Sequence, residues 1–237
     1  MRNPIYLFLP PRDDGILMFI GGENGLDQVR SGPLETVALA IKGQNVILVV
    51  PGRDVLLTWV EPPKGAKRRQ LERAVPFMLE DDLLNPVEQL HFALGKVEAD
   101  GRLPVAVVAR KTMDAWMAVV AVLEIQPQLM VCDTLLLPMT PGTWPVFMDP
   151  ETAWVRLGMN EGFMIERSNL ITFLTLALKR PSLPQRIRVR NFSQEPSVVD
   201  WSGLPLPVEQ ETGTKDRMVE LVGEGVPTTV VNLLQGG

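Results

Sequence analysis

The side chains that most often carry chemistry are scarce in this chain, and their spacing matches no common catalytic motif. There is one histidine, His91, and one cysteine, Cys132, which cannot by themselves form the usual zinc cage. No G-x-S-x-G element is present to hold a serine nucleophile, and the chain has neither a G-x-G-x-x-G nor a P-loop nucleotide motif. We therefore predict a structural role for His91 in a strand, a core position for Cys132, and no catalytic residue, cofactor or metal site.

A run of basic residues followed by acidic ones, in the middle of the chain, is the strongest candidate for binding. Arginine is enriched at protein interfaces, and opposite charges set the register and the association rate of two partners. The alternative is an ordinary solvated helix face. The candidate docking residues are Lys67, Arg68, Arg69, Glu72, Arg73, Glu80, Asp81 and Asp82.

The overall charge argues against a nucleic-acid partner. The 237 residues include 23 Lys and Arg against 28 Asp and Glu, a net charge of −5 with a pI near 5.1. Nucleic-acid binders usually carry a strong basic excess that displaces counterions from phosphates. With 46% hydrophobic residues, the chain is expected to fold into one large domain or a few small ones, at roughly 100–200 residues each.

Cysteine usage and apolar patterning indicate a compartment. One cysteine cannot form an intramolecular disulfide, which suits a reducing environment. The first apolar run is too short for a secretory signal, and the runs at 113–125 and 170–178 are shorter than the roughly 20 residues that cross a bilayer. We expect a chain that begins in the cytoplasm and does not itself span a membrane.

The pattern of apolar residues predicts two halves with the same order of elements. In the first half, strands at 5–9, 15–20 and 46–50 and a helix at 33–42 indicate α/β layering. In the second half, short strands are predicted at 146–148, 153–157 and 163–165, followed by a helix that Ser168 caps. The proline-rich segment 138–145 is the clearest linker between them.

Further elements lie between and after these halves. The segment 66–84 is amphipathic, and Pro76 predicts either a kink or two short helices with Pro76 in the first turn of the second. Thr112 is expected to cap a helix at 113–123. The remaining predicted elements are strands at 54–60, 90–95, 103–109, 129–131 and 186–192, a helix at 215–222, and a last strand or exit segment at 228–234.

The strand at 186–192 carries three arginines at alternate positions. Arg186, Arg188 and Arg190 therefore share one face of the strand. We expect that face to be solvated, although an acidic partner or anionic lipid could also bind it.

Paired halves of this kind are similar to actin and the sugar kinases, in which ATP sits between two ribonuclease H-like halves and each first hairpin wraps a phosphate. Those loops read D-x-G-(S/T) and D-x-G-x-G-T, because glycines let backbone N–H groups point at the anion. Here Ile16 replaces the hydroxyl of the first loop, Pro150 removes an N–H from the second, and Glu151 adds repulsion. We predict degenerate phosphate loops at Asp13, Asp14 and Gly15, and at Asp149, Pro150, Glu151 and Thr152.

Several sequence phrases, taken in order, resemble the cytoplasmic domain of the inner-membrane protein L family of the type II secretion system. The resemblance runs over the whole chain, is strongest from 49 to 137, and includes no catalytic motif. The phrases lie at 49–52, 54–58, 68–70, 74–80, 90–95, 107–110, 113–116 and 232–236.

The resemblance implies an actin-like ATPase fold without the nucleotide-binding residues. The α/β chain is then expected to comprise two related ribonuclease H-like subdomains and an inserted smaller α+β subdomain. The implied boundaries are 1–60 with 98–138 for the first subdomain, 61–97 for the insert, and 139–237 for the second subdomain.

The resemblance also implies a non-enzymatic scaffold on the cytoplasmic face of the bacterial inner membrane. Members of this family recruit the N-terminal domain of the secretion ATPase, protein E, and we assign that docking to the insert. Inner-membrane proteins M and F are further expected partners, a homodimer is possible, and no nucleic acid or small-molecule substrate is expected. The transmembrane helix would follow residue 237.

Two other functions remain open at this point. The chain could be an active actin-like ATPase in which other donors replace the phosphate loops. It could also be the related adaptor of type IV pilus assembly, which binds nucleotide and a short peptide. That adaptor, however, has glycine-bearing loops that this sequence lacks.

Overall fold

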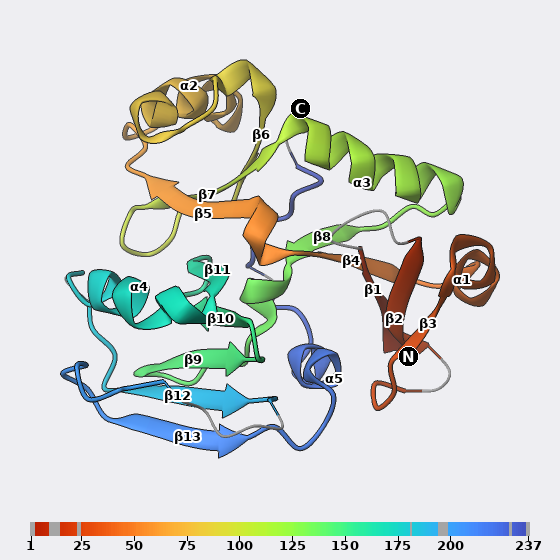
Figure 1. Cartoon of the computed structure of the whole chain (residues 1–237). Coiled ribbons are helices and arrows are strands. Elements are labelled where there is room, and N and C mark those ends of the chain that lie inside the picture. The colour runs from red at the N-terminus through yellow and green to blue at the C-terminus, as the bar shows by residue number, and fades with distance from the viewer. Residues whose placement is uncertain are drawn as a thin grey trace.

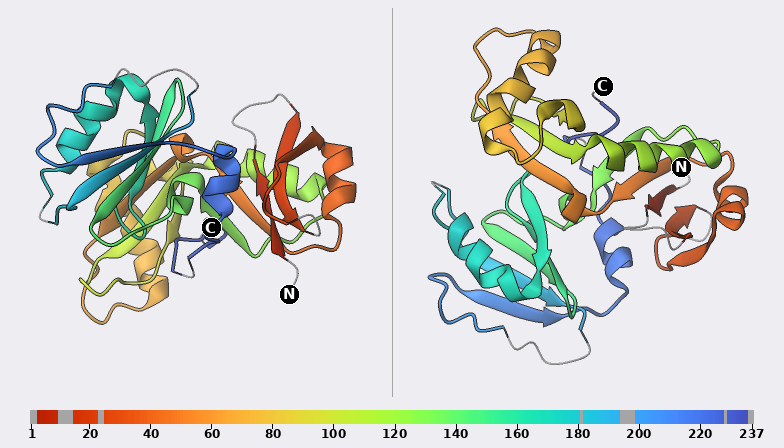
Figure 2. Two further views of the ribbon diagram at one scale, coloured as in Figure 1. Left: turned by 90° about the horizontal axis from the view of Figure 1, so that it is seen from below. Right: turned by 45° about the horizontal axis from the view of Figure 1, so that its top comes forward.

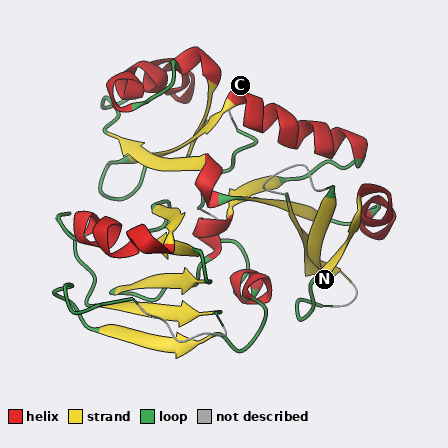
Figure 3. Cartoon of the chain, viewed as in Figure 1, coloured by secondary structure: helices red, strands yellow, loops and turns green. Residues whose placement is uncertain are grey.

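Two five-stranded sheets and one three-stranded sheet organise the computed structural model of the chain (Figure 1). The structure describes residues 3–9, 15–22, 25–180, 182–193, 199–227 and 229–235. Helices lie mainly on the outer faces of the sheets (Figure 3). Within the described residues, no helix is long and apolar enough to cross a bilayer.

The first five-stranded sheet has the order β3-β2-β1-β4-β8. Strands β1, β2 and β3 are antiparallel neighbours, whereas β4 and β8 run parallel to β1. The first apolar runs pair in the predicted way, because their alternate side chains bury against α1 and α3. The bounds are β1 Asn3–Phe8, β2 Ile16–Gly22, β3 Arg30–Pro33, α1 Leu34–Ile41, β4 Val46–Val50, α3 Arg110–Val122 and β8 Leu129–Cys132.

The second five-stranded sheet has the order β11-β10-β9-β12-β13, with antiparallel pairs from β9 to β11 and parallel pairs from β9 to β13. Its apolar face packs against α4. The bounds are β9 Thr143–Met148, β10 Thr152–Arg156, β11 Gly162–Glu166, α4 Leu170–Ala177, β12 Arg186–Asn191, β13 Val208–Thr212 and α5 Arg217–Val222.

The two sheets repeat one topology. In each, the first strand lies at the centre, the second and third extend antiparallel to one side, and the last two extend parallel to the other. This is the arrangement expected of two related ribonuclease H-like halves. The predicted mixed α/β fold class is therefore confirmed.

The three-stranded sheet, in the order β5-β7-β6, carries helix α2 on one face. Leu71, Val75 and Leu79 of α2 are buried against it. The sheet extends beyond the predicted insert 61–97 on both sides, because β5 and the whole of β7 lie outside that range. The bounds are β5 Val55–Val60, α2 Arg68–Leu79, β6 Leu90–Leu94 and β7 Leu103–Ala109.

Pro76 does not divide the amphipathic segment into two helices. It lies in the last turn of a single helix, α2, which continues into a short 3₁₀ turn at Glu80–Asp82. The prediction of two helices with Pro76 in the first turn of the second is wrong. Burial of one continuous apolar face outweighs the single backbone hydrogen bond that proline removes.

Two predicted caps are also wrong. Helix α3 begins at Arg110 directly after β7, so Thr112 lies inside its first turn. Ser168 lies in the 3₁₀ turn Arg167–Asn169, and α4 begins only at Leu170. In both cases the residue at the N-cap position, Ala109 or Asn169, makes no side-chain capping hydrogen bond.

The last described residues, 229–235, form no strand, and we call them the exit segment. The amide of Asn160 accepts from Val231 N–H at 2.7 Å, and Leu233 N–H donates to Met130 O at 2.9 Å. His91 Nε2 lies 2.8 Å from Leu233 O. These contacts tie the exit segment to all three sheets, since their partners lie in or beside β10, β8 and β6.

The stability of the folded chain depends on pH through His91, which contacts the exit segment. Its ring is buried, and burial is the largest cause that lowers its pKa below the usual 6.5. The unfolded chain therefore binds a proton at His91 more readily than the folded chain does. The free energy of unfolding consequently falls as the pH drops below about 6.5. When the pH is lowered from about 7.5 to about 5.5, we expect the melting temperature of His91→Gln, measured by circular dichroism, to fall less than that of the parent chain. Equal losses in both proteins would contradict this role.

Candidate functional site

The second phosphate loop is closed by its own aspartate. Asp149 Oδ1 accepts hydrogen bonds from the N–H groups of Glu151, at 3.0 Å, and Thr152, at 2.7 Å. Pro150 between them has no N–H. The backbone donors that a phosphate would need are thus occupied within the turn.

The first phosphate loop is only partly visible. Asp13 and Asp14 lie outside the described residues. Gly15 is exposed and has φ +69°, the left-handed conformation that glycine adopts without strain.

Helix α5 lies between the two five-stranded sheets in every view of Figures 1 and 2. Its Val219, Leu221 and Val222 are buried in the core of the first half. Its first residue, Arg217, stacks on the ring of Trp154 at 3.8 Å from the guanidinium to the centroid. The side of the cleft that faces the second phosphate loop therefore already holds a cation and an aromatic ring from the protein itself.

A buried carboxylate, Asp133, joins the two halves beneath this cleft. It accepts from Gly52 N–H at 2.8 Å and from Trp154 Nε1 at 2.9 Å, and Thr134 Oγ1 lies 3.3 Å away. Burial is the largest cause that raises the pKa of Asp133, and the nearby Arg217 opposes it. Asp133 thus links the end of β4, the connection after β8, and β10.

A cavity of about 370 Å³ remains beside the second phosphate loop. Arg53 and Arg217 line it, but so do Asp149 and Glu151, and these acids cancel the positive charge that a triphosphate requires. Among the described residues, no cluster of three or more histidine, cysteine or acidic side chains could hold a metal ion.

The predicted docking residues lie on α2, at Lys67 directly before it, and on the turn that follows it. All eight are exposed. Arg69 and Arg73 lie away from the apolar face that packs on the sheet, whereas Arg68 and Glu72 lie at its border beside β6. Arg69 and Arg73 have no ion pair among the described residues, so both are open to a partner. The eight residues are Lys67, Arg68, Arg69, Glu72, Arg73, Glu80, Asp81 and Asp82.

Arg68 has a structural task as well. Its guanidinium donates to the carbonyls of Leu94 and Gly95 at 2.6 Å each, and it pairs with Glu72 at 3.1 Å. Arg68 therefore fastens α2 to the end of β6.

Exposed apolar side chains beside these charges were missed by sequence reasoning. Phe77 is 68% exposed, and Met78 and Leu84 are exposed as well. Helical spacing could have found Phe77, which lies away from the Leu71, Val75 and Leu79 side of α2, whereas Met78 falls on that side by its spacing and is exposed all the same. An interface needs such anchors at its centre, with charges around them.

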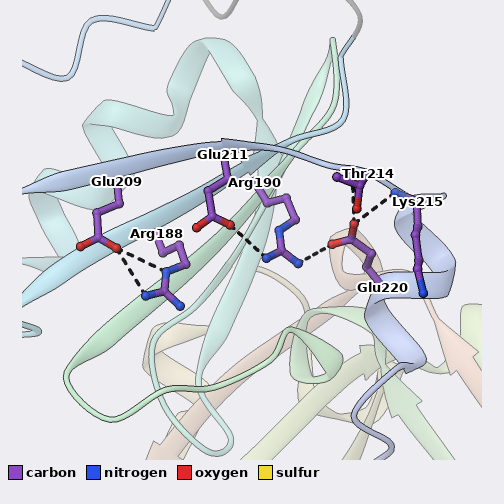
Figure 4. Close-up of polar contacts among 7 residues, drawn as sticks. All are labelled: Arg188, Arg190, Glu209, Glu211, Thr214, Lys215 and Glu220. Carbon is purple, nitrogen blue, oxygen red and sulfur yellow. Dashed lines mark hydrogen bonds and ion pairs between the residues drawn. The ribbon is translucent and has the colours of Figure 1, made fainter.

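The three alternating arginines are not a free solvated face. Arg188 pairs with Glu209, and Arg190 pairs with Glu211 and Glu220 (Figure 4). Arg186 also pairs with Glu209, at 2.7 Å. The face is partly exposed to solvent, as expected, but its charges are paired, because the parallel neighbour β13, which the sequence analysis missed, brings its own carboxylates into register.

Comparison with known proteins places these features in a family. A family profile described as type II secretion system (T2SS), protein L matches residues 27–237. Type II secretion system protein L of Dickeya chrysanthemi is 30% identical over 141 residues, which cover 58% of this chain and 35% of that protein. The protein of the same name from Pectobacterium carotovorum subsp. carotovorum is 34% identical over 127 residues, covering 52% and 29%.

A solved structure has the same fold. The cytoplasmic domain of EpsL, an inner membrane component of the type II secretion system of Vibrio cholerae, covers 99% of this chain and 98% of its own, with a TM-score of 0.77 at 19% identity.

The Asp133 network can be tested by its amide variant. We expect Asp133→Asn to reduce the free energy of unfolding by about 1–3 kcal/mol, because an amide N–H then faces a donor that previously met an oxygen. Urea denaturation of the variant and the parent chain measures this difference. The exposed change Asp114→Asn is the control, and an equal effect from both variants would contradict the network's importance.

Proposed function

We propose, because this chain belongs to the type II secretion system protein L family, that it is a non-enzymatic scaffold that recruits the secretion ATPase, protein E, to the inner membrane. The family profile covers residues 27–237. The matched part of the chain spans only about a third of the curated relatives, 35% and 29% of their lengths. The proposal therefore concerns the part of such a protein that this chain represents.

The single observation that carries the docking proposal is the outer face of α2. It combines the unpaired guanidinium groups of Arg69 and Arg73 with the exposed side chain of Phe77. An apolar anchor surrounded by charges is what a protein partner needs to bind in one orientation. The partner is the N-terminal domain of protein E.

The wider assembly follows from the family. We propose that the chain acts on the cytoplasmic face of the inner membrane, and that proteins M and F of the platform are further partners. A second copy of the chain is a possible partner as well. No nucleic acid, cofactor or small-molecule substrate is part of the proposal.

The proposed lack of ATP hydrolysis rests on the closed second phosphate loop. Asp149 consumes the donors of its own loop, and Asp149 and Glu151 add negative charge to the cavity beside it. These contacts support a scaffold in preference to an active ATPase or a nucleotide-binding pilus adaptor.

Charge reversal on α2 tests the docking face. We expect Arg69→Glu with Arg73→Glu to weaken association with the isolated N-terminal domain of protein E about ten-fold or more, since like charges then face the partner's acids. Isothermal titration calorimetry measures the affinity, and the melting temperature stays unchanged because both side chains are exposed.

The matched control for this experiment is Lys42→Glu with Lys179→Glu. It makes the same change in net charge at exposed positions outside the three-stranded sheet and α2. Equal weakening by both double variants would mean that only the overall charge matters. Unchanged affinity of the α2 variant would move the docking surface elsewhere.

Thermal shift with Mg-ATP tests the lack of a nucleotide site. A site with a Kd of about 10 µM, exposed to about 1 mM ligand, adds about 2.7 kcal/mol of stability. We expect no change in melting temperature. A rise that saturates with Mg-ATP concentration would favour an active or nucleotide-regulated protein.

A further inference from the structure

Strand β6 forms one edge of the three-stranded sheet, so one of its two sides has no strand partner among the described residues. It pairs only with β7, with Phe92 opposite Val107 and Leu94 opposite Val105. An open edge presents backbone N–H and C=O groups that can pair with another chain.

The hydrogen-bond pattern identifies which groups point outward. Gly95 N–H donates to Pro104 O at 2.8 Å, so Gly95 faces β7. In an antiparallel pair, successive residues alternate between the two sides. His91 and Ala93 therefore also bond to β7, and Leu90, Phe92 and Leu94 direct their backbone groups to the open side.

Two arginines cap the ends of this open edge. Arg110 donates to Leu90 O at 3.1 Å, and Arg68 donates to Leu94 O at 2.6 Å. Leu90 N–H bonds back to Val87 O. What remains without a partner among the described residues is the N–H and C=O of Phe92 and the N–H of Leu94.

Phe92 and Leu94 line a cavity at this edge, and of the two only Phe92 retains some exposure, since Leu94 is 1% exposed. A cavity of about 300 Å³ lies along the β6 edge, with Glu72 and Pro76 of α2 on one side and Arg110 at one end. Val87 and Phe92 give its inner wall an apolar surface. The cavity adjoins the α2 face, since Glu72 belongs to both.

We propose that this edge accepts an extended segment of a partner protein, which adds a fourth strand to the sheet. The segment is short, because the two arginine caps leave room for roughly five residues. It makes two backbone hydrogen bonds, both to Phe92. This deepens the proposed function and rests on it, since the segment is assigned to the ATPase that binds the α2 face.

The surroundings specify the side chains of that segment. Phe92 faces α2, so the residue opposite it points toward Pro76 and Val87 and is apolar. A neighbouring residue points to the other face, where the exposed guanidinium of Arg110 favours a carboxylate. An alternating apolar and acidic strand is therefore the chemistry that fits.

Amide hydrogen exchange, followed residue by residue by NMR, tests the strand addition with the isolated N-terminal domain of protein E as the probe. We expect the amide of Phe92 to exchange faster in the free chain than the amide of Ala93, which is bonded to β7. On binding, we expect the exchange of Phe92 to slow at least about ten-fold, because an added strand bonds through main-chain groups. Ala93 serves as the internal control and changes little.

Variants of the capping arginine give a second readout. We expect Arg110→Glu to weaken association about ten-fold, whereas Lys111→Glu, an exposed neighbour with the same charge change, leaves it unchanged. If Arg110→Glu lowers the protection of the Ala93 backbone amide, Arg110→Gln is used in its place. The glutamine side chain can still donate to Leu90 O, while the charge is lost.

Each outcome decides between the two proposals. Association without protection of Phe92 overturns the strand addition and leaves the proposed function standing. No association overturns the proposed function itself, and the strand addition with it. Protection that appears when the chain alone is concentrated identifies a second copy as the occupant and overturns the assignment to a partner protein.

Discussion

The buried carboxylate of Asp133 is the constraint on which the arrangement of the two halves depends. A carboxylate without water needs donors, and its donors come from Gly52 after β4, from Thr134 and from Trp154 in the second half. Trp154 in turn carries Arg217 of α5 on its ring. One polar group therefore positions the first half, the second half and the helix between them. Trp154 and Arg217 also line the cavity beside the second phosphate loop.

Much of this molecule could be predicted from its residues. The repeated hairpin, the buried strand at 46–50, the weak phosphate loops and the exposed charges of the α2 segment all follow from apolar periodicity or from the loss of glycine and hydroxyl groups. The structural role of His91 and the buried position of Cys132 are confirmed as well. These features depend on local patterns, which a single sequence displays directly.

The features that sequence analysis missed depend on partners distant in the chain. Strand β3, Arg30–Pro33, lacks β-branched residues, and β13 follows a long proline-rich stretch, so each is a strand only because a neighbour pairs with it. The carboxylates that neutralise Arg188 and Arg190 lie about 20 to 30 residues away. Helix starts were misplaced for the same reason, since tertiary packing overrode the local capping preference.

The clamp on the exit segment has a mechanical consequence. Val231, Asn232 and Leu233 are each hydrogen-bonded to a different part of the body, through Asn160, through Met130 and through His91. Pulling this segment away from the body requires that hydrogen bonds beside all three sheets break, because its three residues are held at three different places.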